Sequence, residues 1–272
     1  MVRNALQWIA ALFIGYALYL GLLFVQQRSM MFPGTSIYWD GVGRHLPAHA
    51  ERVELPASFG RAQGVLLRAP VAESMAPAAL YFHGNAEFVD QNLDLLQQVA
   101  ALGMHVLLLE YPGYAGTDGR PTRGSLGETA RLGYDWLAAR PDVDASRMVA
   151  IGRSVGTGPA VDLAGERDLA ALVLLAPFTS VTDFAWRMGA PPFLVRDRFD
   201  NVSGVVHFDG PLLVLHGRRD GIIPFAHGEA VAAASQRGQL LALDCGHNDC
   251  PFFGAEAMAV LRRFLEGAGT LP

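Results

Sequence analysis

Six short apolar runs, separated by longer stretches with helical spacing, constrain the fold of this chain more than any other feature of the sequence. Each run is apolar at consecutive positions, which is typical of a strand that is covered on both faces of a parallel sheet. The runs are residues 78–82, 105–109, 148–151, 171–175, 212–215 and 240–243. Strands that alternate with helices predict an α/β fold built on a doubly wound sheet.

The segments around these runs complete the predicted sheet and its helices. Residues 53–59 and 64–68 predict the two strands of an antiparallel hairpin ahead of the first run. Apolar residues at helical spacing predict helices that end before Gly103 and before Pro141, and residues 255–265 predict a closing helix. We therefore expect a mostly parallel, twisted sheet of about eight strands that is flanked by helices.

The sharpest chemical signal is Gly152-Arg153-Ser154-Val155-Gly156, which stands between the third apolar run and a stretch of small residues. In a strand–turn–helix with this pattern, the turn leaves no room for side chains two positions before and two positions after the serine. The serine hydroxyl then lies at a helix N-terminus, where N–H groups favour a developing negative charge. We predict that Ser154 is a nucleophile.

A serine hydroxyl needs a histidine base that is oriented by a carboxylate, and both follow later in the chain. Asp220 comes after the predicted strand 212–215, and His247 follows the last run. The order serine, aspartate, histidine is that of the α/β-hydrolase triad and differs from the orders in chymotrypsin and subtilisin. Other acids lie nearby but do not follow the penultimate strand: Asp209, Asp244 and Asp249.

An oxyanion needs two backbone donors that point at the same place. The first is expected to be the N–H of Val155, directly after the serine. The second should come from the loop His83-Gly84-Asn85-Ala86 after the first run, and we assign it to the main-chain N–H of Asn85. His83 and His216 each precede a glycine at a strand end, which favours a structural, hydrogen-bonded role over a catalytic one.

The N-terminus differs from the rest of the chain, because residues 8–25 carry no charge and lie between Arg3 and Arg28. About 18–20 apolar residues suffice for a helix to cross a hydrocarbon core of about 30 Å. We predict a single membrane span, with the anchor and juxtamembrane segment in residues 1–30 and a hydrolase domain in residues 31–272. The alternatives are an interfacial helix or a cleaved signal sequence, although the latter usually has an apolar core of roughly 7–15 residues. The flanking charges favour a cytoplasmic N-terminus and a domain on the extracytoplasmic side.

The amino-acid composition excludes several classes of catalysis and of binding partner. All 21 basic residues are arginine, which excludes Schiff bases, Walker-type phosphate loops and Ser-Lys dyads. The formal net charge of -5 provides no basic face for a phosphate backbone, so nucleic acid is not an expected partner. No Cys-x-x-Cys pair occurs, and Pro47 interrupts the helical spacing of His45 and His49, so we expect no metal and no cofactor. Cys245 and Cys250 either form a bridge, in an oxidising compartment, or stay free.

Several motifs resemble those of a known family. They are Tyr81-Phe82-His83-Gly84-Asn85, residues 110–119, residues 152–158, Pro177-Phe178-Thr179-Ser180, His216-Gly217-Arg218-Arg219-Asp220 and Gly246-His247-Asn248-Asp249. From about residue 50 to about residue 265 the chain resembles the α/β-hydrolases related to Bem46 and to the human α/β-hydrolase domain-containing groups 12, 13 and 17. The apolar N-terminus followed by Met31-Phe32-Pro33 is also similar, since members of that family often carry one membrane-spanning segment.

The resemblance implies an α/β-hydrolase fold, the triad roles of Ser154, Asp220 and His247, and hydrolysis of acyl esters, thioesters or lipids. One position departs from the family, because Pro112 stands where relatives commonly carry arginine. The resemblance therefore carries no substrate preference to this chain. The interval 179–209 leaves room for only a short lid.

Apolar residues of this lid predict either an acyl-binding surface or ordinary packing under a loop: Phe184, Trp186, Met188, Phe193 and Leu194. The main hypothesis is a serine hydrolase that forms an acyl-enzyme from a small acyl or lipid substrate. A serine peptidase or amidase would use the same triad, and a membrane-tethered scaffold that binds lipid or protein would retain it without catalysis. The complete triad and both glycines of the serine turn favour an enzyme. The acyl chain, the head group and the oligomeric state are left open.

Overall fold

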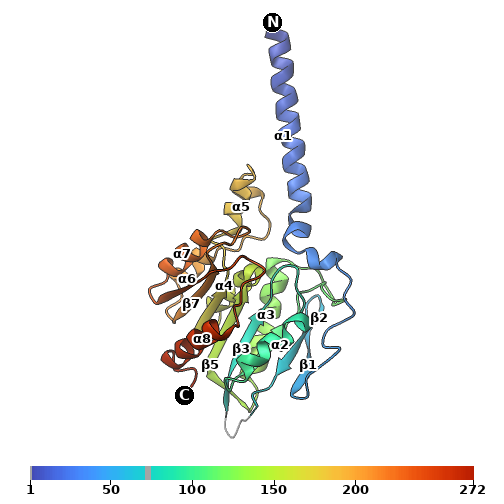
Figure 1. Ribbon diagram of the computed structural model, residues 1–272. Helices are drawn as coiled ribbons and strands as arrows, with labels where there is room; N and C mark the ends of the chain where they lie inside the picture. The colour runs from blue at the N-terminus through green and yellow to red at the C-terminus, as the bar shows by residue number, and fades with distance from the viewer. Residues whose placement is uncertain (1, 71–74) are drawn as a thin grey trace.

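In the computed structural model, which describes residues 2–70 and 75–272, eight strands form one sheet (Figure 1). The strands are β1 (Ala50–Ala57), β2 (Gly60–Leu67), β3 (Ala76–Phe82), β4 (His105–Leu109), β5 (Val143–Arg153), β6 (Ala171–Leu175), β7 (Leu212–Gly217) and β8 (Gly238–Leu243). Their order in the sheet is β1-β2-β4-β3-β5-β6-β7-β8. The pairs β1–β2 and β2–β4 are antiparallel, and all other neighbours are parallel. The predicted fold class is thus confirmed.

The central strands show why consecutive apolar residues predict this sheet. Every residue of β3, β4, β6 and β7 is buried, because helices cover both faces. β5 is longer than the predicted strand 148–151 and begins at Val143. Its first part includes Asp144, which is partly exposed, and Ser146, which is exposed, so an apolar run does not reveal it.

β2 begins at Gly60, before the predicted strand 64–68, because Ser58 and Phe59 form the hairpin turn, so Gly64 lies inside the strand. A Cβ atom on Gly64 would stand 2.4 Å from the carbonyl oxygen of Leu108 in the paired strand. Glycine is needed here because two backbones approach closely.

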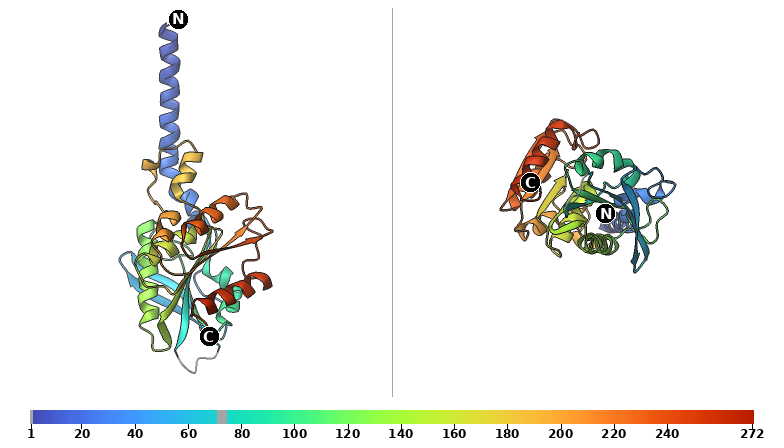
Figure 2. Two further views of the ribbon diagram at one scale, coloured as in Figure 1. Left: turned by 90° about the vertical axis from the view of Figure 1, so that its left-hand side faces the viewer. Right: turned by 90° about the horizontal axis from the view of Figure 1, so that it is seen from below.

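Helices cover the two faces of the sheet in two groups. On one face, α3 (Arg123–Ala138), α4 (Thr157–Ala164), α6 (Asn201–Val206) and α7 (Phe225–Ala234) contact one another in series. On the other face lie α2 (Val89–Ala100) and the closing helix α8 (Ala255–Gly267) (Figures 1 and 2). The carboxyl ends of the parallel strands stay uncovered by these helices, and that edge holds the site described below.

After β6 the chain makes a short excursion above this edge. A bridge between Ser180 and Asp200 closes the neck of the excursion. Residues 181–198, which lie between these two bridge residues, are called the lid arm here. The lid arm contains α5 (Val181–Arg187) and the 3-10 helix η3 (Pro192–Leu194), and at Asn201 the chain returns to the body as α6.

The helix α1 (Val2–Met31) projects from the body on the side of the lid arm (Figures 1 and 2). None of its residues is buried, and its mean hydropathy reaches 2.2 over 18 residues, so by length and composition it is able to cross a membrane. At about 1.5 Å per residue the helix is about 45 Å long, which exceeds a hydrocarbon core of about 30 Å. Part of α1 is therefore available for contacts with the body.

Candidate active site

Ser154 stands in a strained turn between β5 and α4. Its φ of 51° lies in the left-handed region, which a residue with a side chain seldom adopts. A Cβ atom on Gly152 would stand 2.4 Å from the carbonyl oxygen of Gly156, and one on Gly156 would stand 2.2 Å from that of Phe82. Neighbouring backbone therefore requires both glycines of the motif.

Three side chains singled out from the sequence meet at the carboxyl edge of the sheet. Ser154 Oγ is 3.1 Å from Nε2 of His247, and Nδ1 of the same ring is 2.6 Å from Oδ2 of Asp220. All three residues are buried. In this arrangement the imidazole can take a proton from the hydroxyl while the carboxylate holds its other nitrogen.

Asp220 is fixed by the turn that follows β7. Its Oδ1 accepts hydrogen bonds from the N–H groups of Ile222 and Ile223, at 2.9 and 2.8 Å, which leaves Oδ2 for His247. His216 Nε2 donates to the carbonyl oxygen of Ile223 at 2.8 Å and so braces the same turn. Burial lowers the pKa of His216, which therefore supports the turn as a neutral ring.

The other nearby acids have different partners. Asp249 accepts a hydrogen bond from the N–H of Gly246 at 2.9 Å, Asp244 pairs with Arg219 at the surface, and Asp209 is exposed. Within residues 2–70 and 75–272, no group of three or more His, Cys, Asp or Glu side chains is arranged to hold a metal ion.

The loop that carries His247 is closed by a disulfide between Cys245 and Cys250. The sequence leaves this pairing open, and the structure joins the two residues with their Cα atoms 4.9 Å apart. The carbonyl oxygen of Cys245 also accepts a hydrogen bond from the N–H of Arg219, next to Asp220. The loop of the histidine is therefore tied to the turn of the aspartate.

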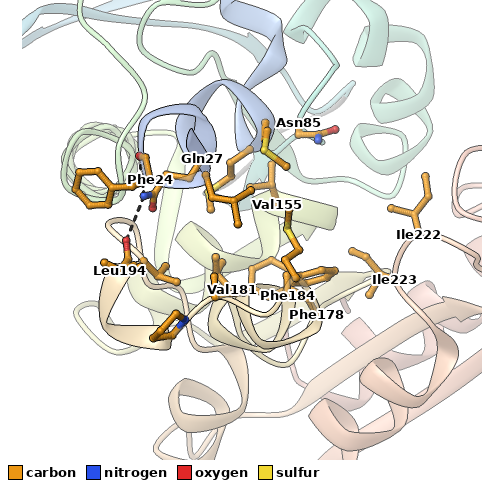
Figure 3. Close-up of a pocket in the computed structure, with 18 of the residues that line it drawn as sticks. Phe24, Gln27, Asn85, Val155, Phe178, Val181, Phe184, Leu194, Ile222 and Ile223 are labelled. Atoms are coloured by element: carbon orange, nitrogen blue, oxygen red, sulfur yellow. Dashed lines mark hydrogen bonds between the residues drawn. The ribbon is translucent and has the colours of Figure 1, made fainter. Parts of the chain in front are cut away.

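The two main-chain N–H groups assigned to an oxyanion hole belong to residues that border Ser154. Asn85 and Val155 line the same cavity as Ser154 (Figure 3). In the described part of the chain, neither N–H group donates a hydrogen bond to another protein group. Both donors are therefore available to a ligand in the cavity.

The carbonyl groups of the loop around Asn85 are held by three side chains. The hydroxyl of Tyr111 donates to the carbonyl oxygen of His83 at 2.5 Å, and that of Tyr114 donates to Asn85 at 2.6 Å. The ring of His83 donates from Nδ1 to the carbonyl oxygen of Gly84 at 2.8 Å. These bonds set the direction of the Asn85 N–H. The role of the tyrosines is not visible in the sequence, because it depends on a tertiary contact.

A buried ion pair lies behind the same loop. Nε2 of His83 is 2.9 Å from Oε1 of Glu110, and both side chains are fully buried. Burial lowers the pKa of His83, but the charge and hydrogen bond of Glu110, the carbonyl of Gly84 and the charge of Glu87 together hold this pKa above its ordinary value. Glu110 also accepts the N–H groups of Val89 and Tyr111. A protonated His83 ring donates to the carbonyl oxygen of Gly84 and to the Glu110 carboxylate at the same time. His83 therefore has a structural role.

A cavity of about 340 Å³ opens beside Ser154 and is bounded mostly by apolar side chains (Figure 3). Of the apolar lid residues, Phe184, Met188 and Leu194 line it, whereas Trp186 and Phe193 are exposed and do not. The last part of α1 forms another wall with six residues: Leu20, Leu23, Phe24, Gln27, Met30 and Met31. The cavity is thus built from the body, the lid arm and α1 together.

Solved structures with this architecture define the class of protein. Est1E from Butyrivibrio proteoclasticus superposes with a TM-score of 0.66 at 14% identity, over 80% of this chain and 98% of that protein. The esterase Pf2001 of Pyrococcus furiosus gives 0.65 at 17% identity, over 85% and 99%. The α/β hydrolase GrgF from Penicillium gives 0.66 at 17%, over 82% and 99%. At these identities the likeness concerns the fold, which is that of the α/β-hydrolases.

Relatives in sequence narrow the class, although no family model matches the chain. An uncharacterized protein of Mycobacterium tuberculosis is 34% identical over 205 residues, which are 72% of each chain. Human α/β-hydrolase domain-containing protein 17B is 31% identical over 180 residues, 64% of this chain and 62% of the human protein. Caenorhabditis elegans aho-3, also named as an α/β-hydrolase domain-containing protein, is 32% identical over 193 residues, 69% and 57%. The chain has the α/β-hydrolase fold and is related in sequence to proteins named as α/β-hydrolase domain-containing, the human protein 17B among them. It spans less than two thirds of those two named relatives.

Proposed function

We propose that this chain is a serine hydrolase that cleaves acyl esters or thioesters of lipids or small acyl compounds. Ser154 is the nucleophile, His247 the general base and Asp220 the acid that orients the base. The observation that carries the proposal is the continuous chain of contacts from Ser154 Oγ through His247 to Asp220, at 3.1 and 2.6 Å. This chain of contacts borders an apolar cavity, and the α/β-hydrolase fold together with the similarity to α/β-hydrolase domain-containing proteins supports the same role.

In the proposed reaction, Nε2 of His247 takes the proton of Ser154 while Oγ attacks the acyl carbonyl carbon. The resulting oxyanion accepts hydrogen bonds from the N–H groups of Asn85 and Val155, each worth on the order of 3 kcal/mol. His247 then gives its proton to the leaving alcohol or thiol, and an acyl-enzyme remains. Water, deprotonated by His247, releases the carboxylic acid and restores the serine hydroxyl.

The cavity lining favours an acyl substrate over a peptide. A peptide needs hydrogen-bond partners for its N–H and C=O groups, whereas an acyl chain needs only apolar surface. Among the lining residues only Gln27, Asn85 and Ser154 have polar side chains. We therefore place ester and thioester hydrolysis ahead of peptidase or amidase activity.

We further propose that α1 is a retained single-pass anchor and that the hydrolase body lies on the extracytoplasmic side. The length and hydropathy of α1 support the anchor. The bridge between Cys245 and Cys250 supports the orientation, because disulfides persist in oxidising compartments. Protease added to intact spheroplasts should digest the body, and a protected body would reverse the orientation.

Labelling with a fluorophosphonate probe tests the nucleophile. The wild-type chain in membranes should label, and Ser154→Ala should not, although both should unfold at the same temperature. A folded wild-type chain that stays unlabelled would favour the non-catalytic scaffold instead. Where labelling succeeds, an ester and an anilide of the same acyl group separate esterase from amidase activity, since an esterase cleaves the ester faster.

A further inference from the structure

Helix α1, which the sequence predicts to be a membrane anchor, also forms one wall of the cavity beside Ser154. From α1, the side chains of Leu20, Leu23 and Phe24 line the cavity, and from the lid arm Phe184 and Leu194 do so. In the close-up, Phe24 and Leu194 lie on the side of the cavity away from Ile222 and Ile223 (Figure 3). One side of the cavity is therefore formed where α1 and the lid arm meet.

Hydrogen bonds join the outer end of the lid arm to α1 far from the body. The hydroxyl of Tyr16 donates to the carbonyl oxygen of Gly189 at 2.6 Å, and that of Tyr19 donates to Met188 at 2.7 Å. Two successive carbonyl groups at the end of α5 are thus satisfied by side chains of α1. The lid arm therefore runs along α1 and does not lie flat on the body.

A second set of contacts joins the two elements close to the body. Gln27 donates to the carbonyl oxygen of Leu194 at 3.2 Å and accepts the N–H of Arg196 at 2.8 Å. Arg28 forms an ion pair with Asp197 at 2.7 Å. Since the first set involves Tyr16, about 18 Å from Arg28 along the helix, the lid arm follows α1 over roughly that length.

These contacts locate the membrane surface relative to the cavity. Residues 2–19 of α1 measure about 27 Å, close to the roughly 30 Å of a hydrocarbon core. Tyr16 and Tyr19 then lie near the interface, where tyrosine is enriched. Leu20, Leu23 and Phe24 line the cavity, so in this arrangement the span lies nearer the N-terminus than residues 8–25. The outer end of the lid arm lies at the depth of the two tyrosines.

The outer surface of the lid arm suits such a position. Trp186 is 65% exposed and Phe193 is 73% exposed, although both are large and apolar. Arg187 and Arg198 are exposed beside them. At a membrane interface aromatic rings enter the acyl region, and arginine side chains reach the phosphates of anionic lipids.

We propose that the lid arm is embedded in the surface of the membrane that α1 crosses, and that the acyl chain of a lipid in this leaflet enters the cavity laterally, between α1 and α5. The acyl carbonyl reaches Ser154 while the rest of the chain lies along the apolar side of α1. The inference rests on the proposed function, because Ser154 is the group that receives the carbonyl. It adds the source of the substrate, which is the bilayer itself.

Two esters test this route with the full chain in vesicles of phosphatidylglycerol and phosphatidylcholine. One is water-soluble p-nitrophenyl butyrate, and the other is a fluorogenic long-chain ester held in the bilayer. Trp186→Asp and Phe193→Asp should keep the soluble-ester rate within about twofold and lose about tenfold or more on the bilayer ester, because a carboxylate enters a membrane poorly. Leu95→Asp, a matched control at an exposed position of α2, should change neither rate. Equal losses on both esters, or no loss on the bilayer ester, would overturn the proposal.

A second experiment measures the position of the lid arm and does not depend on enzymatic activity. Lipids that are brominated on their acyl chains quench tryptophan fluorescence on contact. Trp186→Phe should remove part of the quenching seen in the wild type, and Trp136→Phe in α3 should not. Unchanged quenching in Trp186→Phe places the lid arm outside the membrane and refutes the proposal. A wild-type chain that cleaves neither ester contradicts the proposed function, and the quenching still decides whether the lid arm is inserted.

Discussion

The side chains with proposed chemical roles depend on neighbours that do not line the cavity. His216 braces the turn of Asp220, and the hydroxyls of Tyr111 and Tyr114 hold the carbonyl groups of the loop that carries Asn85. A hydrogen-bond donor for an oxyanion is useful only when it points at the place where the charge develops. The neighbours therefore act on the geometry of the reaction and have no contact with the substrate.

Tyr111→Phe tests this positioning role. The change removes a buried hydrogen bond and leaves the carbonyl oxygen of His83 without this donor, which costs about 1–3 kcal/mol of stability. The loop that carries Asn85 can then turn away from its present orientation. We expect kcat for an ester to fall about tenfold while KM changes little, because the donor acts on the transition state. Tyr134→Phe is the matched control, since its hydroxyl donates to Asp168 outside this loop. An equal fall of kcat in both variants would contradict the role.

The sequence predicts some residues of the site and not others for a physical reason. Parallel strands end at the same edge of the sheet, so Ser154, Asp220 and His247 can be brought together from strand order alone. Tyr111 and Tyr114 act through their hydroxyls on another loop, and no local pattern encodes that contact. The contribution of α1 to the cavity wall cannot be predicted from the sequence for the same reason. An apolar run of this length predicts a membrane span, and its contact with the cavity depends on the tertiary structure.

Among the elements, those buried on both faces are the most predictable. The strands β3, β4, β6 and β7 appear as apolar runs, and α8 shows its apolar face at helical spacing. The alternation of strands and helices predicts a helix between β7 and β8, where α7 lies, but no local pattern gives the bounds of α5, α6 or α7. α5 and α6 are too short to show a period, and the apolar residues of α7 are not confined to one face. Capping explains where α5 begins, because Ser180 accepts the N–H of Asp183.

The disulfide loop between β8 and α8 supports a prediction at the scale of an element. Replacing Cys245 and Cys250 together by serine should lower the free energy of unfolding by about 2 kcal/mol, the value expected for so short a loop. It should also slow fluorophosphonate labelling, because His247 is less well held. Dithiothreitol should have the same effect on the wild type and none on the double variant. A labelling rate that survives verified reduction of the bond would contradict this account.

For the whole molecule, buried histidines couple stability to pH. Burial lowers the pKa of His105, His216 and His227, whereas Glu110, Gly84 and Glu87 together outweigh burial and raise the pKa of His83. A histidine with a lowered pKa binds its proton more readily when unfolded, so its contribution is lost as the pH falls below about 6.5. His83 has the opposite sign: its contribution is present below about pH 6.5 and is lost as the pH rises through the raised pKa.

Three histidines with lowered pKa values outnumber the one with a raised pKa. The melting temperature should therefore fall as the pH is lowered from about 7 to about 5. His105→Gln should make this fall shallower, because a buried group that resists protonation has been removed. His105 lies at the start of β4, so the change leaves Ser154 and its partners in place. His49→Gln, at an exposed position, serves as the control and should leave the slope unchanged. Calorimetric scans across this range measure both, and a slope in His105→Gln equal to that of the wild type would contradict the assignment.

The wall that α1 contributes to the cavity also has an evolutionary meaning. Under the proposed function, a gene that lost the codons for this helix would lose the membrane anchor of its product and one side of its acyl-binding cavity in a single event. In the proposed arrangement Leu20 and Leu23 come directly after the membrane-spanning residues 2–19, so a shift of that span along α1 would also change the wall of the cavity. Under the proposed function, the membrane location of the protein and the acyl chains that it accepts are therefore linked traits.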